Sequence, residues 1–129
     1  MFNRRTSYNN ISTVKTGEDL ACAYLVGKKY KVLRRNYREK WDEIDIICRA
    51  RDETLVFVEV KTFGTESGAG LVPEDNMTPA KLKKLRRACE AFVGKHAAAV
   101  NEKKGWRIDL VAIVLGGDGE PAIRHYENI

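Results

Sequence analysis

The sequence has no apolar run of the roughly 20 residues that a helix needs to cross a bilayer. Its first ten residues are polar and basic, and no apolar stretch follows them, so we expect no secretory signal. Cysteine is scarce: Cys22, Cys48 and Cys89 have an odd count and no metal-ligand spacing, which is typical of free thiols in a reducing compartment. These absences predict a cytoplasmic protein without a membrane attachment.

Several catalytic patterns are also missing. The serines have no accompanying His and Asp arrangement, so a serine-hydrolase triad is unsupported. The glycines between residues 64 and 77 are not followed by Gly-Lys-Ser/Thr, so they form no phosphate loop; we expect them to let a loop close over a ligand. His96 and His125 stand far apart and are expected at the surface rather than on a metal.

The charge that is present is unevenly placed. There are 23 basic and 18 acidic residues, a net charge of +5, and the basic ones crowd two segments. Such clusters favour a polyanionic partner such as nucleic acid. The alternative is a plain solvated face on each element. The clusters are Lys28, Lys29, Lys31, Arg34, Arg35, Arg38 and Lys40, and then Lys81, Lys83, Lys84, Arg86 and Arg87.

Hydrophobic periodicity and turn residues divide the chain into a short tail and a single domain. A flexible tail is expected over residues 1–12 and the domain over 13–129. The expected helices cover residues 13–28 and 78–99, and the expected strands cover 30–37, 43–48, 54–62, 106–115 and 121–126. Thr78 is the expected N-cap of the second helix, with Pro79 as its first residue. Glycines at 116–119 predict a hairpin turn.

This order predicts an α/β fold with a mixed sheet flanked by helices. The second and third strands are joined by a tight turn and should be antiparallel. A helix separates the third strand from the fourth, so these two should be parallel. The third strand is almost continuously apolar, which indicates a central strand covered on both faces.

Charged residues interrupt this apolar pattern in two strands. Alternation places Glu59 and Lys61 on one face of the third strand, and Asp45 on the same face as Glu43 in the second. Adjacent strands lie about 4.8 Å apart, so Asp45 and Glu59 are expected to converge. A carboxylate in a central strand is costly unless it is paired or bound to a metal.

Two converging carboxylates form a hard oxygen site suited to Mg²⁺ or Mn²⁺. The carbonyl of Val60 would add a ligand, and Lys61 would orient an attacking water or neutralise charge on a phosphate. Together these groups suit metal-assisted phosphodiester hydrolysis. The alternative interpretation is an ion pair of Lys61 with Glu59 or Asp45 on a half-wet sheet face.

Glu18 lies on the apolar stripe of the first helix rather than opposite it, within about 20° of Leu25 at 100° per residue. Its carboxylate is therefore expected to point toward the sheet and join the site. The competing interpretation is an acid in the first helical turn, where the helix dipole favours it.

Several short motifs of the sequence together resemble those of a known protein family. The segments 17–21 (GEDLA), 43–47 (EIDII), 56–62 (VFVEVKT), 78–79 (TP) and 107–111 (RIDLV) resemble the YraN-like family, UPF0102, over about residues 16–127. That family is similar to the restriction-endonuclease superfamily and especially to archaeal Holliday-junction resolvases.

The resemblance implies an αβββαβ core with an extra C-terminal strand. It also implies that Asp45, Glu59 and Lys61 are the D…E-x-K motif, with Glu18 as the helix acid. Where family members often have a small residue before E-I-D, this chain has Trp41 and Asp42.

The leading hypothesis is therefore a magnesium-dependent endonuclease that acts on nucleic acid, with branched or damaged DNA as the expected substrate. Lys81, Lys84 and Arg87 would contact phosphates. Cutting a four-way junction would need two active sites and hence a homodimer. The alternatives are a non-catalytic nucleic-acid-binding module with the same fold and, if the basic clusters face away from the acidic site, a partner-binding protein. For Asp109 a structural role is expected, and the alternatives are that it buttresses the site or pairs with Lys61 or Arg107.

Overall fold

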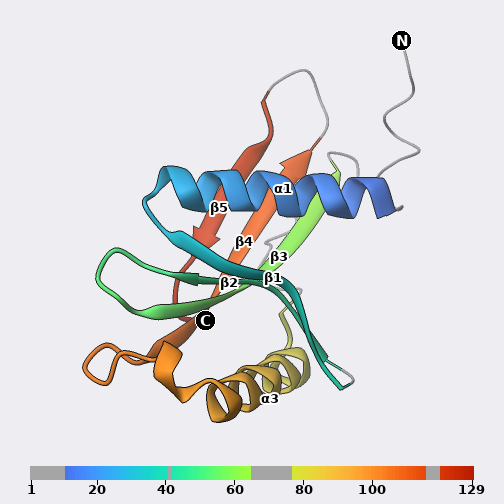
Figure 1. Cartoon of the computed structure of the whole chain (residues 1–129). Coiled ribbons are helices and arrows are strands. Elements are labelled where there is room, and N and C mark those ends of the chain that lie inside the picture. The colour runs from blue at the N-terminus through green and yellow to red at the C-terminus, as the bar shows by residue number, and fades with distance from the viewer. Residues whose placement is uncertain (1–10, 41, 65–76, 116–119) are drawn as a thin grey trace.

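The computed structural model describes residues 11–40, 42–64, 77–115 and 120–129. Two helices and five strands account for most of these residues (Figure 1). The elements are α1 (Ile11–Gly27), β1 (Lys31–Glu39), β2 (Asp42–Arg49), β3 (Leu55–Gly64), α3 (Pro79–Lys95), the short 3₁₀ turn η3 (Ala97–Ala99), β4 (Trp106–Leu115) and β5 (Ala122–Tyr126).

The strands form one mixed sheet in the order β1-β2-β3-β4-β5. Only β3 and β4 are parallel, because α3 lies between them in the chain, and the other three pairings are antiparallel. Helix α1 covers one face of the sheet and α3 covers the other (Figure 1). This arrangement confirms the expected αβββαβ core with an extra C-terminal strand.

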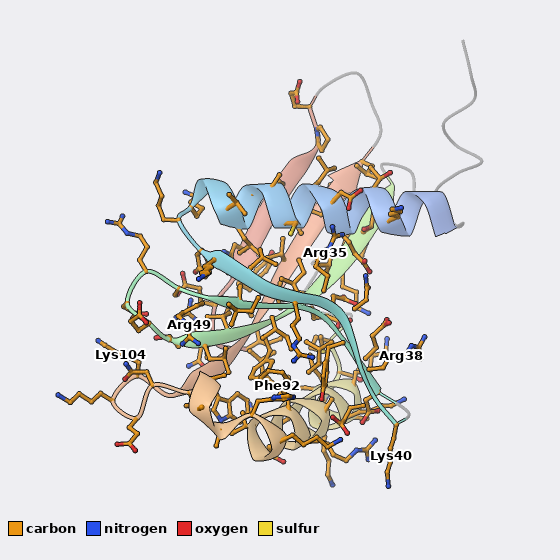
Figure 2. The ribbon with its side chains drawn as sticks, in the orientation of Figure 1. Arg35, Arg38, Lys40, Arg49, Phe92 and Lys104 are labelled. Carbon is orange, nitrogen blue, oxygen red and sulfur yellow. The ribbon has the colours of Figure 1, made fainter. Side chains whose placement is uncertain are left out.

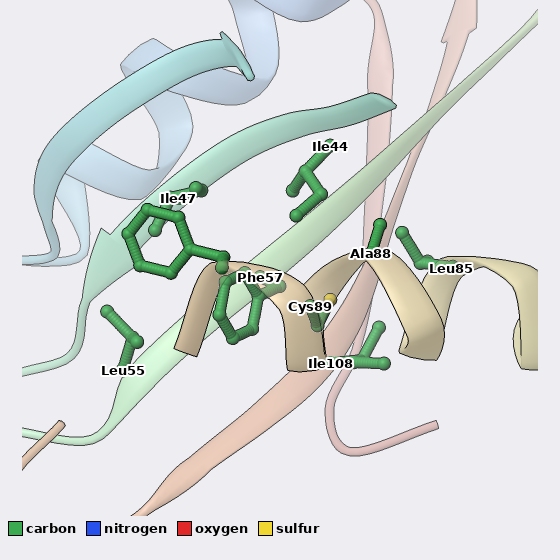
Figure 3. Packing of buried hydrophobic residues seen from close by; sticks show 9 residues of the cluster. Ile44, Ile47, Leu55, Phe57, Leu85, Ala88, Cys89 and Ile108 are labelled. Atoms are coloured by element: carbon green, nitrogen blue, oxygen red, sulfur yellow. The ribbon is translucent and has the colours of Figure 1, made fainter. Parts of the chain in front are cut away.

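The core has two layers because β3 is apolar on both faces. Val56 and Val58 of β3 pack toward Ala21 and Leu25 of α1. On the other face, Phe57 belongs to the cluster that contains Leu85, Ala88, Cys89 and Phe92 of α3 (Figure 3). Burying both faces of one strand explains its continuous run of apolar residues.

The predicted end of the second helix is wrong by one turn. Thr78 caps α3 as expected, with its side chain accepting from Lys81 N at 3.2 Å. The helix ends at Lys95, however, because His96 leaves the helical region and its ring lies against Phe92, with 4.5 Å between ring centroids. The alanines after it form η3, and Arg49 donates to the Ala99 carbonyl at 2.8 Å. Tertiary contacts here outweigh the helix propensity of alanine.

At the N-terminus, α1 begins at Ile11, so residues 11 and 12 are helical rather than part of the predicted tail. Residues 1–10, 41, 65–76 and 116–119 lie outside the described residues, and with them most of the predicted tail, the predicted loop and the predicted hairpin turn. Within the described part of the chain, no helix is long and apolar enough to cross a membrane. The three cysteines are free thiols, as expected.

Gly17 brings α1 close to the end of β3. A Cβ atom at residue 17 would overlap Oγ1 of Thr62 and lie 3.2 and 3.3 Å from its Cβ and Cγ2. Because Thr62 follows Lys61, this contact fixes the position of α1, and of the neighbouring Glu18, over that end of the sheet. The absence of a side chain at Gly17 is thus a packing requirement.

We expect Gly17→Ala to lower the free energy of unfolding by about 1 to 3 kcal/mol, because the methyl group overpacks against a β-branched side chain. Gly94→Ala is the matched control: Gly94 is also helical, but a Cβ there meets nothing within 4 Å. The control should be neutral or more stable by up to about 1 kcal/mol. Urea unfolding of both variants tests this, and equal midpoints would refute the close contact.

Candidate metal and nucleic-acid site

The site forms where β2 and β3 part. These strands pair from Arg49 and Leu55 as far as Ile46 and Val58. Beyond this pair of residues, the Asp45 side chain accepts a hydrogen bond from the neighbouring strand: Val60 N donates to its Oδ2 at 2.8 Å. A backbone amide of β3 is thus satisfied by an acidic side chain of β2 at the point where the ladder ends.

Strict alternation fails at Asp45. Ile44 and Ile46 are two residues apart and should share a face, yet Ile44 belongs to the α3 cluster and Ile46 to the α1 cluster. The alternation of faces is therefore interrupted between Ile44 and Ile46, at Asp45, and the shared face of Asp45 and Glu43 stays a prediction. Despite this change of face in β2, Asp45 contacts β3, the strand beside which the sequence pattern placed it.

Strand β1 turns at the same rung. Asn36 has a φ of +52°, a left-handed conformation that Asn tolerates better than most residues. On one side of it Arg35 reaches Asp19 of α1 at 2.7 Å, and on the other Tyr37 packs edge-on against Phe92 of α3, with ring centroids 5.1 Å apart (Figure 2). Asn36 also hydrogen-bonds Glu18, which favours the ionised carboxylate.

Glu59 and Lys61 form an ion pair with 3.1 Å between Nζ and Oε2. Their side chains are 18% and 31% exposed, so both are within reach of solvent and of a ligand. The ion-pair interpretation is thus compatible with the geometry. It does not account for Asp45, which is not a partner of Lys61 among the described contacts.

Burial raises the pKa of Asp45 to about 8, with the neighbouring Glu59 carboxylate as the next cause. Glu18 and Glu43 raise the pKa further, and the hydrogen bond from Val60 N opposes them. The influence of Glu59 is in line with the predicted convergence of Asp45 and Glu59, which stays a prediction.

Glu18 contributes from α1. Burial is the largest cause of its raised pKa, Glu43 adds to the shift, and Arg35 opposes it. The competing interpretation as a first-turn acid is wrong, because α1 begins at Ile11 and has no acidic residue in its first turn. Glu18 therefore belongs with the acidic cluster rather than with the helix terminus.

A pocket of about 200 Å³ opens beside Glu59 and Lys61. Two acidic residues from the start of β2 lie on one side, and the N-terminal half of α3 forms the other. Basic residues of α3 thus face the acidic cluster instead of pointing away from it. The pocket is lined by Asp42, Glu43, Glu59, Lys61, Met77, Lys81, Lys84 and Leu85.

The three predicted phosphate-binding residues are placed differently. Lys81 and Lys84 line the pocket. Arg87 does not line it but forms a two-pronged contact with Asp42, at 3.0 to 3.2 Å. From the sequence, Asp42 stands out only because family members often have a small residue before the E-I-D motif. Nothing in the linear pattern indicates that α3 packs against this part of β2.

Asp109 lies in a separate buried network. It is fully buried and accepts from Arg107 at 2.9 Å and from Asn128 N at 3.0 Å, and His125 Nε2 lies 2.8 Å away. These hydrogen bonds outweigh burial and lower the pKa of the Asp109 carboxyl. The expected pairing with Arg107 is confirmed and Lys61 is not among its partners. The surface position expected for His125 is wrong, since its side chain is 10% exposed.

Among the described residues, no group of three or more His, Cys, Asp or Glu side chains is arranged to hold a metal ion. The predicted donors are Asp45, which accepts from Val60 N, and Glu59, which is paired with Lys61. Mg²⁺ is commonly held by one or two carboxylates, with water and substrate phosphates completing its six ligands. The chemistry of this donor set therefore fits Mg²⁺ or Mn²⁺ bound together with a phosphate ligand.

Comparison with known proteins gives one consistent family. A family model described as "Uncharacterised protein family UPF0102" matches residues 17–113, a span that includes all four acidic and basic motif residues. A UPF0102 protein of Geobacter sulfurreducens is 41% identical over 122 residues, covering 94% of this chain and 89% of the relative. Similar proteins of Prosthecochloris aestuarii and Mycobacterium marinum are 37% and 34% identical over 113 residues, covering 88% and 84% of this chain and 84% and 86% of the relatives.

Proposed function

The chain belongs to the UPF0102 family, and from that premise we propose that it is a metal-dependent nuclease that hydrolyses phosphodiester bonds, with branched or damaged DNA as the expected substrate. The observation that supports this proposal is that the ion-paired Glu59 and Lys61 share a pocket with lysines of α3, while Asp45 accepts from the amide of the intervening residue of β3. An acidic site faced by a basic helix suits a metal ion and a phosphate bound side by side.

In this proposal Asp45 and Glu59 hold Mg²⁺ or Mn²⁺, with the carbonyl of Val60 as a further ligand. The bound ion would supply Lewis-acid stabilisation of charge on the phosphate. Asp45 is fixed by the amide of Val60 at 2.8 Å, so its remaining oxygen needs little reorganisation to bind a ligand. Glu18 adds negative charge to the cluster and strengthens its preference for a divalent cation.

Lys61 is placed to act on the phosphate rather than on the metal. Its ammonium lies 3.1 Å from Glu59 and lines the pocket, so it can neutralise developing charge or orient the attacking water. Lys81 and Lys84 on the opposite wall would bind flanking phosphates. Cleavage of a four-way junction would further require two such sites in a symmetric dimer.

The second candidate is a nucleic-acid-binding module that keeps the fold without turnover. The ion pair of Lys61 with Glu59 favours it, because the same contact is expected of a lysine that only neutralises a carboxylate. A partner-binding protein is less well supported, since α3 presents two lysines to the acidic pocket.

An activity screen separates these candidates. The protein is titrated with Mg²⁺ and with Mn²⁺ by calorimetry and then incubated with linear, nicked, flapped and four-way DNA. We expect divalent binding and metal-dependent cleavage of at least one branched substrate. Binding without cleavage of any substrate, with either metal, would leave the binding module as the correct interpretation.

We expect a Lys81→Ala, Lys84→Ala, Arg87→Ala triple variant to weaken DNA binding and to flatten the plot of log K against log salt by about 0.9 per lost contact. The reason is that phosphate contacts release counterions from duplex DNA. Fluorescence anisotropy over a range of salt concentrations measures the slope.

An Arg51→Ala, Lys103→Ala, Lys104→Ala variant is the control for net charge, because these three residues are exposed, belong to neither basic cluster and do not line the pocket. Its slope should change much less than that of the α3 variant. Equal slopes in the wild type and the α3 variant would mean that the basic residues of α3 are solvated and do not contact phosphates.

A further inference from the structure

Asp42 lies beneath two cations of α3. Arg87 Nε donates to its Oδ2 at 3.2 Å, Arg87 Nη2 donates to Oδ1 and Oδ2 at 3.1 and 3.0 Å, and Lys84 Nζ lies 3.7 Å from Oδ1. The Asp42 side chain is 8% exposed, whereas those of Lys84 and Arg87 are 58% and 64% exposed. The carboxylate is thus covered by cations that themselves face solvent.

The contact of Asp42 with Lys84 and Arg87 lies between two hollows of the surface. Asp42 and Lys84 line the pocket that contains Glu59 and Lys61. A second hollow, the basic groove, is lined by residues of α3 alone, most of them basic, and Lys84 borders both hollows. The groove is lined by Ala80, Lys83, Lys84, Arg86, Arg87 and Glu90. A polyanion that extends from the acidic pocket into the groove therefore passes over Lys84 and Arg87.

Asp42 could act on these cations in two ways. As a competitor it would release Arg87 when a phosphate binds, but this would leave a nearly buried carboxylate without its strongest partner, which is costly. Arg87 does not need to be released. Its Nε and Nη2 donate to Asp42. No described residue accepts from its Nη1, so the two N–H groups of Nη1 can donate to another acceptor. The geometry therefore favours orientation over competition.

We propose that Asp42 is a positioning residue that fixes Arg87 and Lys84 between the acidic pocket and the basic groove, where they bind a nucleic-acid phosphate adjacent to the one in the pocket. This inference rests on the proposed function and adds an ordered second phosphate site to it. Holding a guanidinium in place before binding removes the entropy cost of ordering it in the complex.

The two roles predict opposite results for Asp42→Asn. Removing a negative charge beside a polyanion site would by itself tighten DNA binding. Loss of positioning weakens binding, because the neutral amide no longer holds the fork of Arg87 by charge-assisted hydrogen bonds. Asp52→Asn is the matched control, since it removes the same charge from the exposed turn between β2 and β3, at the other end of these strands.

The test measures duplex DNA affinity by fluorescence anisotropy for the wild type, Asp42→Asn, Arg87→Ala and the double variant. We expect Asp42→Asn to bind about 2- to 10-fold more weakly, the range that corresponds to ordering one long side chain. In the Arg87→Ala background the same change should cost less, because only Lys84 is then left for Asp42 to position. Arg87→Lys, which keeps a cation over Asp42, should also weaken binding because it lacks the fork.

Several outcomes overturn the inference. Tighter or unchanged binding by Asp42→Asn would mean that Asp42 competes or plays no part. Equal losses in both backgrounds would indicate a general structural effect, and unchanged affinity in Arg87→Lys would show that a point charge suffices. If the wild type binds no DNA at all, the proposed function fails together with the inference, whereas additive losses in a protein that binds DNA refute the inference alone.

Discussion

Replacing Lys61 with Ala is expected to lower the turnover of nucleic-acid cleavage by about 10² to 10⁴, the usual contribution of a positioned general-base or electrostatic group. Affinity for DNA and for Mn²⁺ should change little, because the ammonium acts mainly on charge that develops in the transition state. The structural basis is its place 3.1 Å from Glu59 in the pocket. Single-turnover cleavage measures the rate, and calorimetry measures Mn²⁺ binding.

Lys104→Ala is the control for Lys61→Ala. Lys104 is an exposed lysine in the turn before β4, so its removal changes the net charge equally without touching the pocket (Figure 2). If Lys61 served only as an ion-pair partner of Glu59, Lys61→Ala would instead lower the melting temperature or the DNA affinity, and there would be no turnover to lose.

The second large effect is expected at Asp45. Asp45→Asn should abolish Mn²⁺ binding, because one of two metal carboxylates is lost while the amide oxygen can still accept from Val60 N. The same change should stabilise the protein in the absence of metal. Natural active sites are often less stable than they could be for this reason, because a cluster of like charges destabilises the fold but is needed to bind the ligand.

The sign of the stability change follows from the pKa. Asp45 has its pKa raised from 3.8 to about 8 by burial and by Glu59, so between these values the folded protein holds a proton that the unfolded chain has released. The stability from this proton is fully present below pH 4 and is lost as the pH rises through about 8. Asn has no such dependence, so the advantage of Asp45→Asn should grow with pH over this window.

At pH 8 we expect Asp45→Asn to raise the free energy of unfolding by about 1 to 3 kcal/mol. This is less than the whole shift of the Asp45 pKa would correspond to, because Asp45 interacts strongly with a neighbouring charge. Thermal melts from pH 4 to pH 9 measure it. In the control Asp52→Asn, hydrogen bonds from Thr54 lower the pKa of the native carboxyl, so that change should bring no such gain. A pH-independent gain for Asp45→Asn, or Mn²⁺ binding equal to that of the wild type, would contradict the assignment.

The sequence by itself determined the element order, the antiparallel pairing of β2 with β3, the parallel pairing of β3 with β4 and the central place of β3. Each rests on local information: the run of apolar residues in β3, the tight turn before it and the helix after it. The same reasoning identified Asp45, Glu59 and Lys61, because a charge inside an apolar strand is detectable without knowing what lies above it.

Only the tertiary structure decided how these residues meet. Alternation predicted a straight β2, whereas the strand turns over at Asp45 and opens the ladder so that a carboxylate can reach the amide of Val60. The contact of Arg87 with Asp42 joins residues 45 positions apart, and the burial of His125 depends on Asp109 in a neighbouring strand. Such contacts arise from the packing of α3 and β5 on the sheet, and a linear pattern cannot predict them because it does not specify which distant residues face each other.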